Sequence, residues 1–179
     1  MKKAKAFFIF IAVFHWGGAN LQAQGKFVFS NWSPGWGIDA KILDWNGAPL
    51  AGTNYFAQAY VGWSVDSLVP VGTPVHFRTD RAGYIHSTVV ATPFKALDMV
   101  WAEMRVWAST YNTYEEALAV GGPFGRSNPV QVYLSENPDG GLNYMKGLES
   151  FALVPEPSPL ALITLGALWW WLSHRPNRL

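Results

Sequence analysis

Between residues 24 and 154 the sequence is a series of short segments in which polar and apolar residues alternate, separated by glycine, proline and asparagine. A period of two places successive side chains on opposite faces of a strand, and frequent turn residues keep each strand short. The Asn46-Gly47 pair predicts a tight turn. The sequence therefore predicts a mainly β fold, a single antiparallel β-sandwich. The expected strands are 26–31, 37–47, 55–63, 74–79, 84–91, 99–109, 129–136 and 148–154.

One short helix is expected at 113–122. Thr113 can cap its N-terminus, Glu116 stands at the capping-box position, and Gly121 can end it. Turn residues are expected to separate the strands. These are Pro49, Gly52, Pro70, Gly72, Gly83, Pro93 and the cluster at 138–141.

The segment 99–109 has two distinct faces. One carries Val100, Ala102, Met104 and Val106, and the other carries Trp101, Glu103, Arg105 and Trp107. The sequence leaves open which face is buried. Arg105 is expected to lie between the two tryptophans as a cation–π partner.

Residues 1–23 are typical of a secretory signal peptide. Lys2, Lys3 and Lys5 precede an apolar run of about 11 residues, and small residues lead to an expected cleavage site at Ala23. The alternative is an uncleaved membrane anchor, although the run is shorter than the roughly 20 residues that a spanning helix needs.

The last 25 residues have three parts: Pro155-Glu156-Pro157, an uncharged apolar stretch at 160–172, and a basic tail at 173–179. Proline excludes the first part from a helix interior and makes it an extended spacer. The apolar stretch predicts a short helix of about 20 Å, and basic residues behind it indicate a cytoplasmic end. A cleaved leader and a basic C-terminus together place residues 24–154 outside the cytoplasm.

This ending resembles the PEP-CTERM sorting signal of Gram-negative bacteria, with Pro155, Glu156 and Pro157 as its motif. The resemblance implies recognition by exosortase, a membrane-bound processing enzyme, and removal of the tail. It also implies transient residence in the inner membrane and delivery to the cell surface or an extracellular polysaccharide matrix. The alternative is a plain C-terminal membrane anchor.

A second resemblance covers Arg105 to Leu134. Its motifs are Arg105-Val106-Trp107, a Tyr-Glu-x-Ala helix from Tyr114, and the Gly125-to-Pro129 segment. They are similar to an uncharacterised domain that recurs ahead of PEP-CTERM tails, which implies no activity.

Composition excludes several classes of function. With no cysteine, the chain has no thiol nucleophile, disulfide or thiolate metal site. Without the leader and the basic tail at 173–179, eight basic residues face twelve acidic ones, a net charge of about −4. A mildly acidic domain predicts no binding of nucleic acid.

The sequence gives little support for a catalytic function. His76 and His86 are the only histidines between the two ends, and with Asp80 and Ser87 they would be the candidates of a hydrolase. Their spacing matches no hydrolase motif, so we expect no enzyme and no cofactor. Scattered aspartates give only a weak case for calcium, and Asn31-Trp32-Ser33 matches a glycosylation sequon.

Tryptophans are the remaining candidates. Trp32, Trp36, Trp45 and Trp63 lie in or beside predicted loops and could stack on sugar rings, or they could simply be core residues in a protein without disulfides. The sequence thus predicts an exported surface or matrix protein with a structural or adhesive role. The alternative is a carbohydrate-binding module for extracellular polysaccharide.

Overall fold

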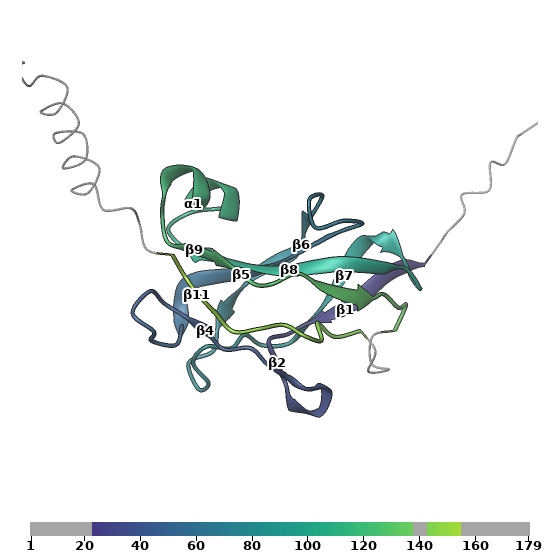
Figure 1. Ribbon diagram of the computed structural model, residues 1–179, viewed down its shortest axis with the longest axis horizontal. Helices are drawn as coiled ribbons and strands as arrows, with labels where there is room; N and C mark the ends of the chain where they lie inside the picture. Colours follow the sequence, from purple (N-terminus) through teal and green to yellow (C-terminus); the bar gives the residue numbers. More distant parts are fainter. Residues whose placement is uncertain (1–22, 138–142, 155–179) are drawn as a thin grey trace, which may run out of the picture.

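The computed structural model describes residues 23–137 and 143–154 (Figure 1). The sorting motif at Pro155, Glu156 and Pro157, the apolar stretch, the basic tail and nearly all of the predicted leader lie outside them. The described chain is mainly β with one short helix, as predicted.

A main antiparallel sheet has the strand order β10-β8-β5-β6. A fifth strand, β9, pairs with the C-terminal half of β8, whereas β10 pairs with its N-terminal half. The bounds are β5 (Gly52–Gly62), β6 (Val69–Phe77), β8 (Met99–Ala108), β9 (Phe124–Arg126) and β10 (Val130–Tyr133).

Three smaller pairings complete the described strands. Antiparallel pairs join β1 to β7 and β2 to β3, whereas β4 and β11 pair in parallel. In Figure 1, β2, β4 and β11 lie below the main sheet and α1 lies above it. The bounds are β1 (Gln24–Phe29), β2 (Trp32–Ser33), β3 (Ile38–Asp39), β4 (Ile42–Leu43), β7 (Thr88–Lys95) and β11 (Phe151–Ala152), with the 3-10 turn η1 at Pro34–Trp36 and the helix α1 at Tyr114–Val120.

Several predicted boundaries are wrong. The expected strand 37–47 is two strands of two residues each, and β7 begins at Thr88 rather than at residue 84. Pro70 and Gly72, predicted as turn residues, lie inside β6, which is an edge strand where a missing N–H costs no ladder bond. Gly72 has φ +65° beside an irregularity in the β5–β6 register, so it forms part of a bulge. Pro93 lies in β7 beside a similar irregularity.

The Asn46-Gly47 turn and the signals at the two ends of the helix are confirmed. Asp44 accepts hydrogen bonds from the backbone N–H groups of Asn46 and Ala48, both at 2.8 Å, and Gly47 has φ +83°. The Thr113 hydroxyl accepts the Glu116 N–H at 3.1 Å and caps α1. Gly121 ends the helix in the left-handed conformation.

Both faces of β8 are largely buried, which resolves the question that its alternation left open. Val100, Ala102, Met104 and Val106 belong to the larger core, together with side chains from β1, β4, β5 and β7. On the other face, Trp107 is fully buried and joins a smaller cluster beneath α1. That cluster contains Tyr60, Trp107, Tyr114 and Ala117.

Asn31 links three separate segments below the main sheet. Its side chain is fully buried and donates to the carbonyls of Ala40 and Gly83, each at 2.8 Å. Its side-chain oxygen accepts the Ile85 N–H at 3.0 Å. Because the amide nitrogen that a glycan would occupy is buried and bonded, the sequon at Asn31 is closed in the folded protein.

Among the described residues, no helix has the length and apolar character needed to cross a membrane.

Candidate functional site

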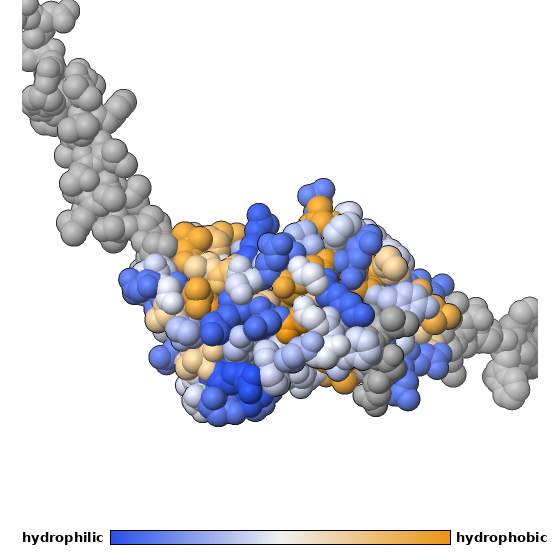
Figure 2. Space-filling model, turned by 60° about the horizontal axis from the view of Figure 1, so that its bottom comes forward, coloured by the Kyte–Doolittle hydropathy of each residue, from blue (hydrophilic) through white to orange (hydrophobic). Residues whose placement is uncertain are grey.

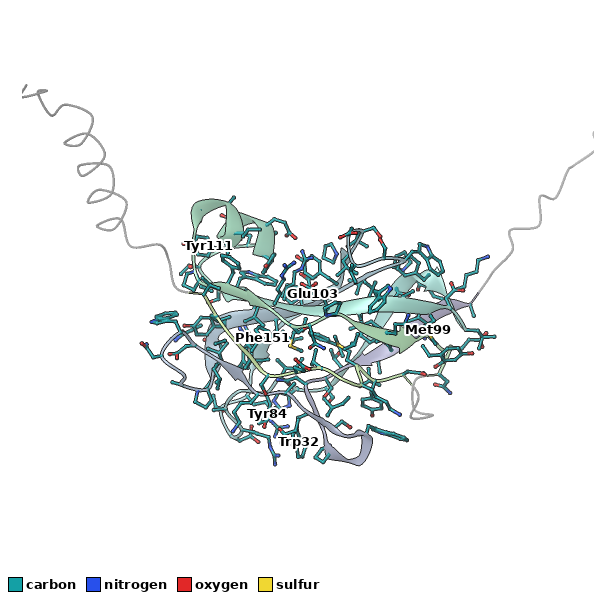
Figure 3. All side chains as sticks on the ribbon, viewed as in Figure 1. Trp32, Tyr84, Met99, Glu103, Tyr111 and Phe151 are labelled. Carbon is teal, nitrogen blue, oxygen red and sulfur yellow. The ribbon has the colours of Figure 1, made fainter. Side chains whose placement is uncertain are left out.

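Two of the four predicted tryptophans, on β2 and on the adjoining turn η1, each lie against a tyrosine. Trp32, on β2, lies 6.4 Å from the Tyr84 ring, and Figure 3 shows these two residues side by side. Trp36, on η1, is 42% exposed and stacks on Tyr144 at 5.9 Å with an interplanar angle of 25°. We call these four residues and their cationic neighbours the tryptophan surface. The neighbours are Lys41, Arg81 and Lys146.

Each cation of the tryptophan surface lies over an aromatic ring. The Arg81 guanidinium is 3.7 Å from the Trp32 ring centroid, the Lys146 ammonium is 4.8 Å from that of Trp36, and Lys41 is 5.8 Å from the ring of Tyr84. These distances are within the range of cation–π attraction. The rings therefore hold three exposed positive charges in a domain whose overall charge is negative.

Tyr84 connects the tryptophan surface to β3 through a hydrogen bond. Its hydroxyl donates to the Asp39 carboxylate, and its side chain is 7% exposed. Burial and this hydrogen bond raise the pKa of Tyr84 to about 12.

Trp45 and Trp63 do not belong to the tryptophan surface. Trp45 follows β4 and is 45% exposed, with no aromatic ring against it among the described residues. Trp63 follows β5, is 62% exposed and lies edge-on to Phe94 at 5.0 Å. The four candidates therefore do not form one sugar-binding row. Figure 2, with the lower side turned forward, shows hydrophobic residues as separate patches among hydrophilic ones.

Two of the hydrolase candidates are engaged in other contacts. His76 stacks on Phe56 at 4.5 Å, and its Nδ1 lies 3.1 Å from the Tyr55 carbonyl. Asp80 pairs with Arg78, whose hydrogen bonds lower the pKa of Asp80 to about 2.

The remaining two candidates do not complete a triad. His86 is exposed, and Ser87 donates to the Ser30 hydroxyl at 2.8 Å. Within the described residues, no hydrogen bond connects either histidine to Asp80 or Ser87.

A charged and aromatic network lies on the opposite side of the main sheet, beneath α1. Arg105 donates through Nε to Glu103 at 3.0 Å, and its Nη1 lies 3.5 Å from Glu115 on α1. Its guanidinium lies 4.1 Å from the Tyr60 ring centroid and 4.9 Å from that of Tyr114. The expected stacking of Arg105 between tryptophans is therefore wrong, because tyrosines from β5 and α1 occupy its two contact positions.

Tyr60 and Trp107 complete this network. The Tyr60 hydroxyl donates to Glu115 at 3.0 Å, and burial together with this bond raises the pKa of Tyr60. The indole N–H of Trp107 donates to the Tyr111 carbonyl at 3.0 Å. The sequence signal for this network was the Trp-x-Glu-x-Arg-x-Trp alternation, but the tyrosine partners come from distant segments and could not be read from it.

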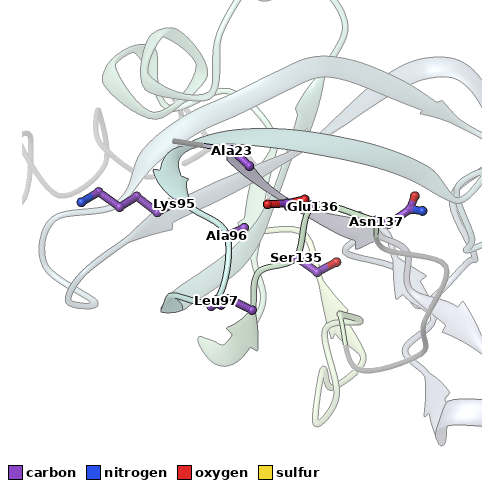
Figure 4. Close-up of a pocket in the computed structure, with 7 residues that line it drawn as sticks. All are labelled: Ala23, Lys95, Ala96, Leu97, Ser135, Glu136 and Asn137. Carbon is purple, nitrogen blue, oxygen red and sulfur yellow. The ribbon is translucent and has the colours of Figure 1, made fainter. Parts of the chain in front are cut away.

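A hollow of about 550 Å³ lies at the end of the domain where β1 begins (Figure 4). Leu97 on its rim is 71% exposed and has φ +74°, an uncommon conformation for a residue with a side chain. Ala23 and Asn137 in its wall adjoin segments outside the described residues, so we assign no function to it. Its lining comprises Ala23, Lys95, Ala96, Leu97, Ser135, Glu136 and Asn137.

The described part of the chain contains no group of three or more histidine, aspartate or glutamate side chains placed to hold a metal ion. Comparison with models of known protein families, with curated proteins and with solved structures finds no match for this chain. Any function assigned to the protein therefore depends on its own sequence and on the geometry of the described residues.

Proposed function

We propose that the protein is an exported surface or matrix protein, carried out of the cytoplasm by residues 1–23 and sorted through a PEP-CTERM signal at residues 155–179. In this proposal it is the substrate of an exosortase-type processing enzyme and is not itself an enzyme. Its role is structural or adhesive.

The observation that carries the proposal is the place of Val154, the last described residue before the motif. The N–H of Val154 donates to the Phe124 carbonyl at 2.8 Å, which fixes Val154 to β9. Pro155-Glu156-Pro157 follows at once. Proline restricts the backbone of the residue before it to extended geometry, and a motif with two prolines directly after a fixed residue suits recognition by a membrane-bound enzyme.

The folded part is proposed to be an antiparallel β-sandwich. The larger core supports this, because it joins Ala57 and Met104 of the main sheet to Phe27 of β1 and Val90 of β7. Two sheets that share one core in this way correspond to a sandwich architecture.

Cell fractionation tests the sorting proposal. We expect the full-length protein at the cell surface or in the matrix, and a variant that ends at Val154 to be exported but not retained there. Glu156→Ala tests the motif itself, with Glu149→Ala, an exposed acidic residue within the domain, as the matched control. Equal retention of all four proteins would refute sorting through this signal.

A second candidate function is binding of extracellular polysaccharide at the tryptophan surface. It is favoured by the exposed ring of Trp36 and by the three cations held over Trp32, Trp36 and Tyr84, which suit a polysaccharide with acidic groups. Charge complementarity of this kind favours encounter and specificity.

Affinity electrophoresis through gels with alginate, and separately with neutral dextran, tests this candidate. We expect retardation by alginate that weakens with salt and is lost in Trp36→Ala and Arg81→Ala. The control is Trp45→Ala, which lies outside the tryptophan surface. Absence of retardation, or equal loss in the control variant, would leave the tryptophans as structural residues.

A further inference from the structure

A polar pocket of about 320 Å³ lies on the α1 side of the main sheet, away from the tryptophan surface. Its floor includes Glu103 of β8, which Figure 3 labels on this side of the sheet. Its walls come from the β5–β6 connection and from the segment between β9 and β10. The lining residues are Val65, Asp66, Glu103, Arg126, Ser127 and Pro129.

One wall exists because the edge of the sheet is interrupted beside Glu103. β9 ends at Arg126 and β10 begins at Val130. The Ser127 N–H still donates to the Met104 carbonyl at 2.9 Å, and residues 128–129 then leave the ladder next to β8. The Ser127 hydroxyl replaces a ladder carbonyl and accepts the Met104 N–H at 3.0 Å. Pro129, which has no N–H, cannot restore the pairing.

The other wall depends on a glycine. A Cβ at Gly62 would lie 2.5 Å from the Ser67 carbonyl oxygen, so only glycine lets the β5–β6 connection approach β5 this closely. A hydrogen bond of 2.9 Å between the hydroxyls of Ser64 and Ser67 closes the connection. Val65 and Asp66 lie between these two serines, at the pocket.

One carboxylate oxygen of Glu103 accepts no hydrogen bond from the described residues. The residue is 3% exposed, and its Oε1 accepts from Arg105. No described residue donates to Oε2. Every fully buried side-chain oxygen or nitrogen of the described residues has a partner, so Oε2 keeps some accessible surface, and Glu103 is one of the residues that line the pocket. Glu103 as a whole is buried, so a ligand that donates to this carboxylate would make a charge-assisted hydrogen bond in a partly desolvated position.

The two other charged side chains of the pocket restrict the chemical class of its ligand. Asp66 adds a second carboxylate acceptor, and Arg126 adds a cationic donor. A free metal ion or an amine would face the repulsion of Arg126, and an anion would face both carboxylates. Vicinal hydroxyl groups can donate to a carboxylate and accept from a guanidinium at once. The volume is at the lower end of ligand pockets, about 300 Å³, and suits one ring rather than a chain.

We propose that this pocket binds a neutral polyhydroxylated ring, such as a single pyranose, through Glu103, Asp66 and Arg126. The site is separate from the tryptophan surface and independent of how the protein is sorted.

Saturation-transfer NMR on the full-length protein in lauryldimethylamine oxide, a detergent without sugar, tests the proposal. The probes are the methyl α-pyranosides of glucose, galactose and mannose, with n-propylamine and acetate as charged comparators. We expect saturation of at least one pyranoside at millimolar concentration and none of the comparators. Asp66→Asn and Arg126→Met should each weaken that binding about tenfold, the loss of one charge-assisted hydrogen bond.

Glu103→Gln should have the same effect, while Glu149→Gln, an exposed control on the chain after residue 143, should leave binding unchanged. Asp66 and Arg126 are exposed, so their variants keep the test valid should Glu103→Gln fail to fold. The proposal is overturned if no pyranoside binds, if the comparators bind equally well, or if the Asp66 and Arg126 variants bind as the unmodified protein does.

Discussion

Replacement of Asn31 should destabilise the protein more than any surface substitution. The Asn31→Ala variant loses two bonds from the amide to the carbonyls of Ala40 and Gly83 and one from the Ile85 N–H. The Ala40 carbonyl and the Ile85 N–H lie at buried residues and lose the partner that Asn31 supplies, whereas the Gly83 carbonyl still accepts from the Ile42 N–H at 3.0 Å.

Each such bond contributes about 1 kcal/mol net, and a buried group left without a partner costs about 1–3 kcal/mol. We therefore expect a loss of about 3–5 kcal/mol in the free energy of unfolding, a large share of the stability of a domain of this size. Asn31→Asp should also destabilise, because an ionised carboxylate cannot donate to the two carbonyls. Its folded-state pKa would be raised, so its penalty should be smallest below about pH 4 and grow as the pH rises.

Urea unfolding followed by far-UV circular dichroism measures both variants. The control is Asn128→Ala, which loses two bonds where Asn31→Ala loses three: one to the Gly147 carbonyl at 2.8 Å and one from the Glu149 N–H at 2.9 Å, both at the surface. We expect the control to lose about 1 kcal/mol or less, because water replaces the lost partners. A loss in Asn31→Ala no larger than in the control would refute the role given to Asn31.

Three further predictions concern single positions. Because the pKa of Tyr84 is raised to about 12, its contribution to stability should be constant below pH 10 and fall as the pH rises through 12. In alkaline unfolding, the Tyr84→Phe variant should therefore lose less stability over that interval than the unmodified protein. Gly62→Ala should cost about 1–3 kcal/mol in thermal unfolding, since its new Cβ meets the Ser67 carbonyl, and an unchanged melting temperature would contradict this. Thr113→Ala removes the cap of α1 and should cost about 1 kcal/mol in urea unfolding, whereas Thr113→Ser should restore most of it.

Local signals in the sequence predicted local structure well. Asn46-Gly47 and the Thr113 cap depend on residues within a few positions of each other, and both are found where they were expected. The alternation in 99–109 predicted the two faces of β8 correctly.

What the sequence could not supply were contacts between distant segments. The tyrosines around Arg105 come from β5 and α1, and the partners of Asn31 are up to 54 positions away. Pro70 was predicted as a turn residue because propensity alone does not show that β6 lies at a sheet edge. The grouping of Trp32 with Trp36, apart from Trp45 and Trp63, likewise depends on the fold.

The central claim is that residues 155–179 are a signal that is recognised and removed during export. Intact-mass spectrometry of the protein isolated from the cell surface and matrix tests it most directly. The account predicts a species that lacks residues 1–23 and the tryptophans at 169–171, with its C-terminus at or close to Pro155-Glu156-Pro157. A cytoplasmic species with both ends intact would contradict it.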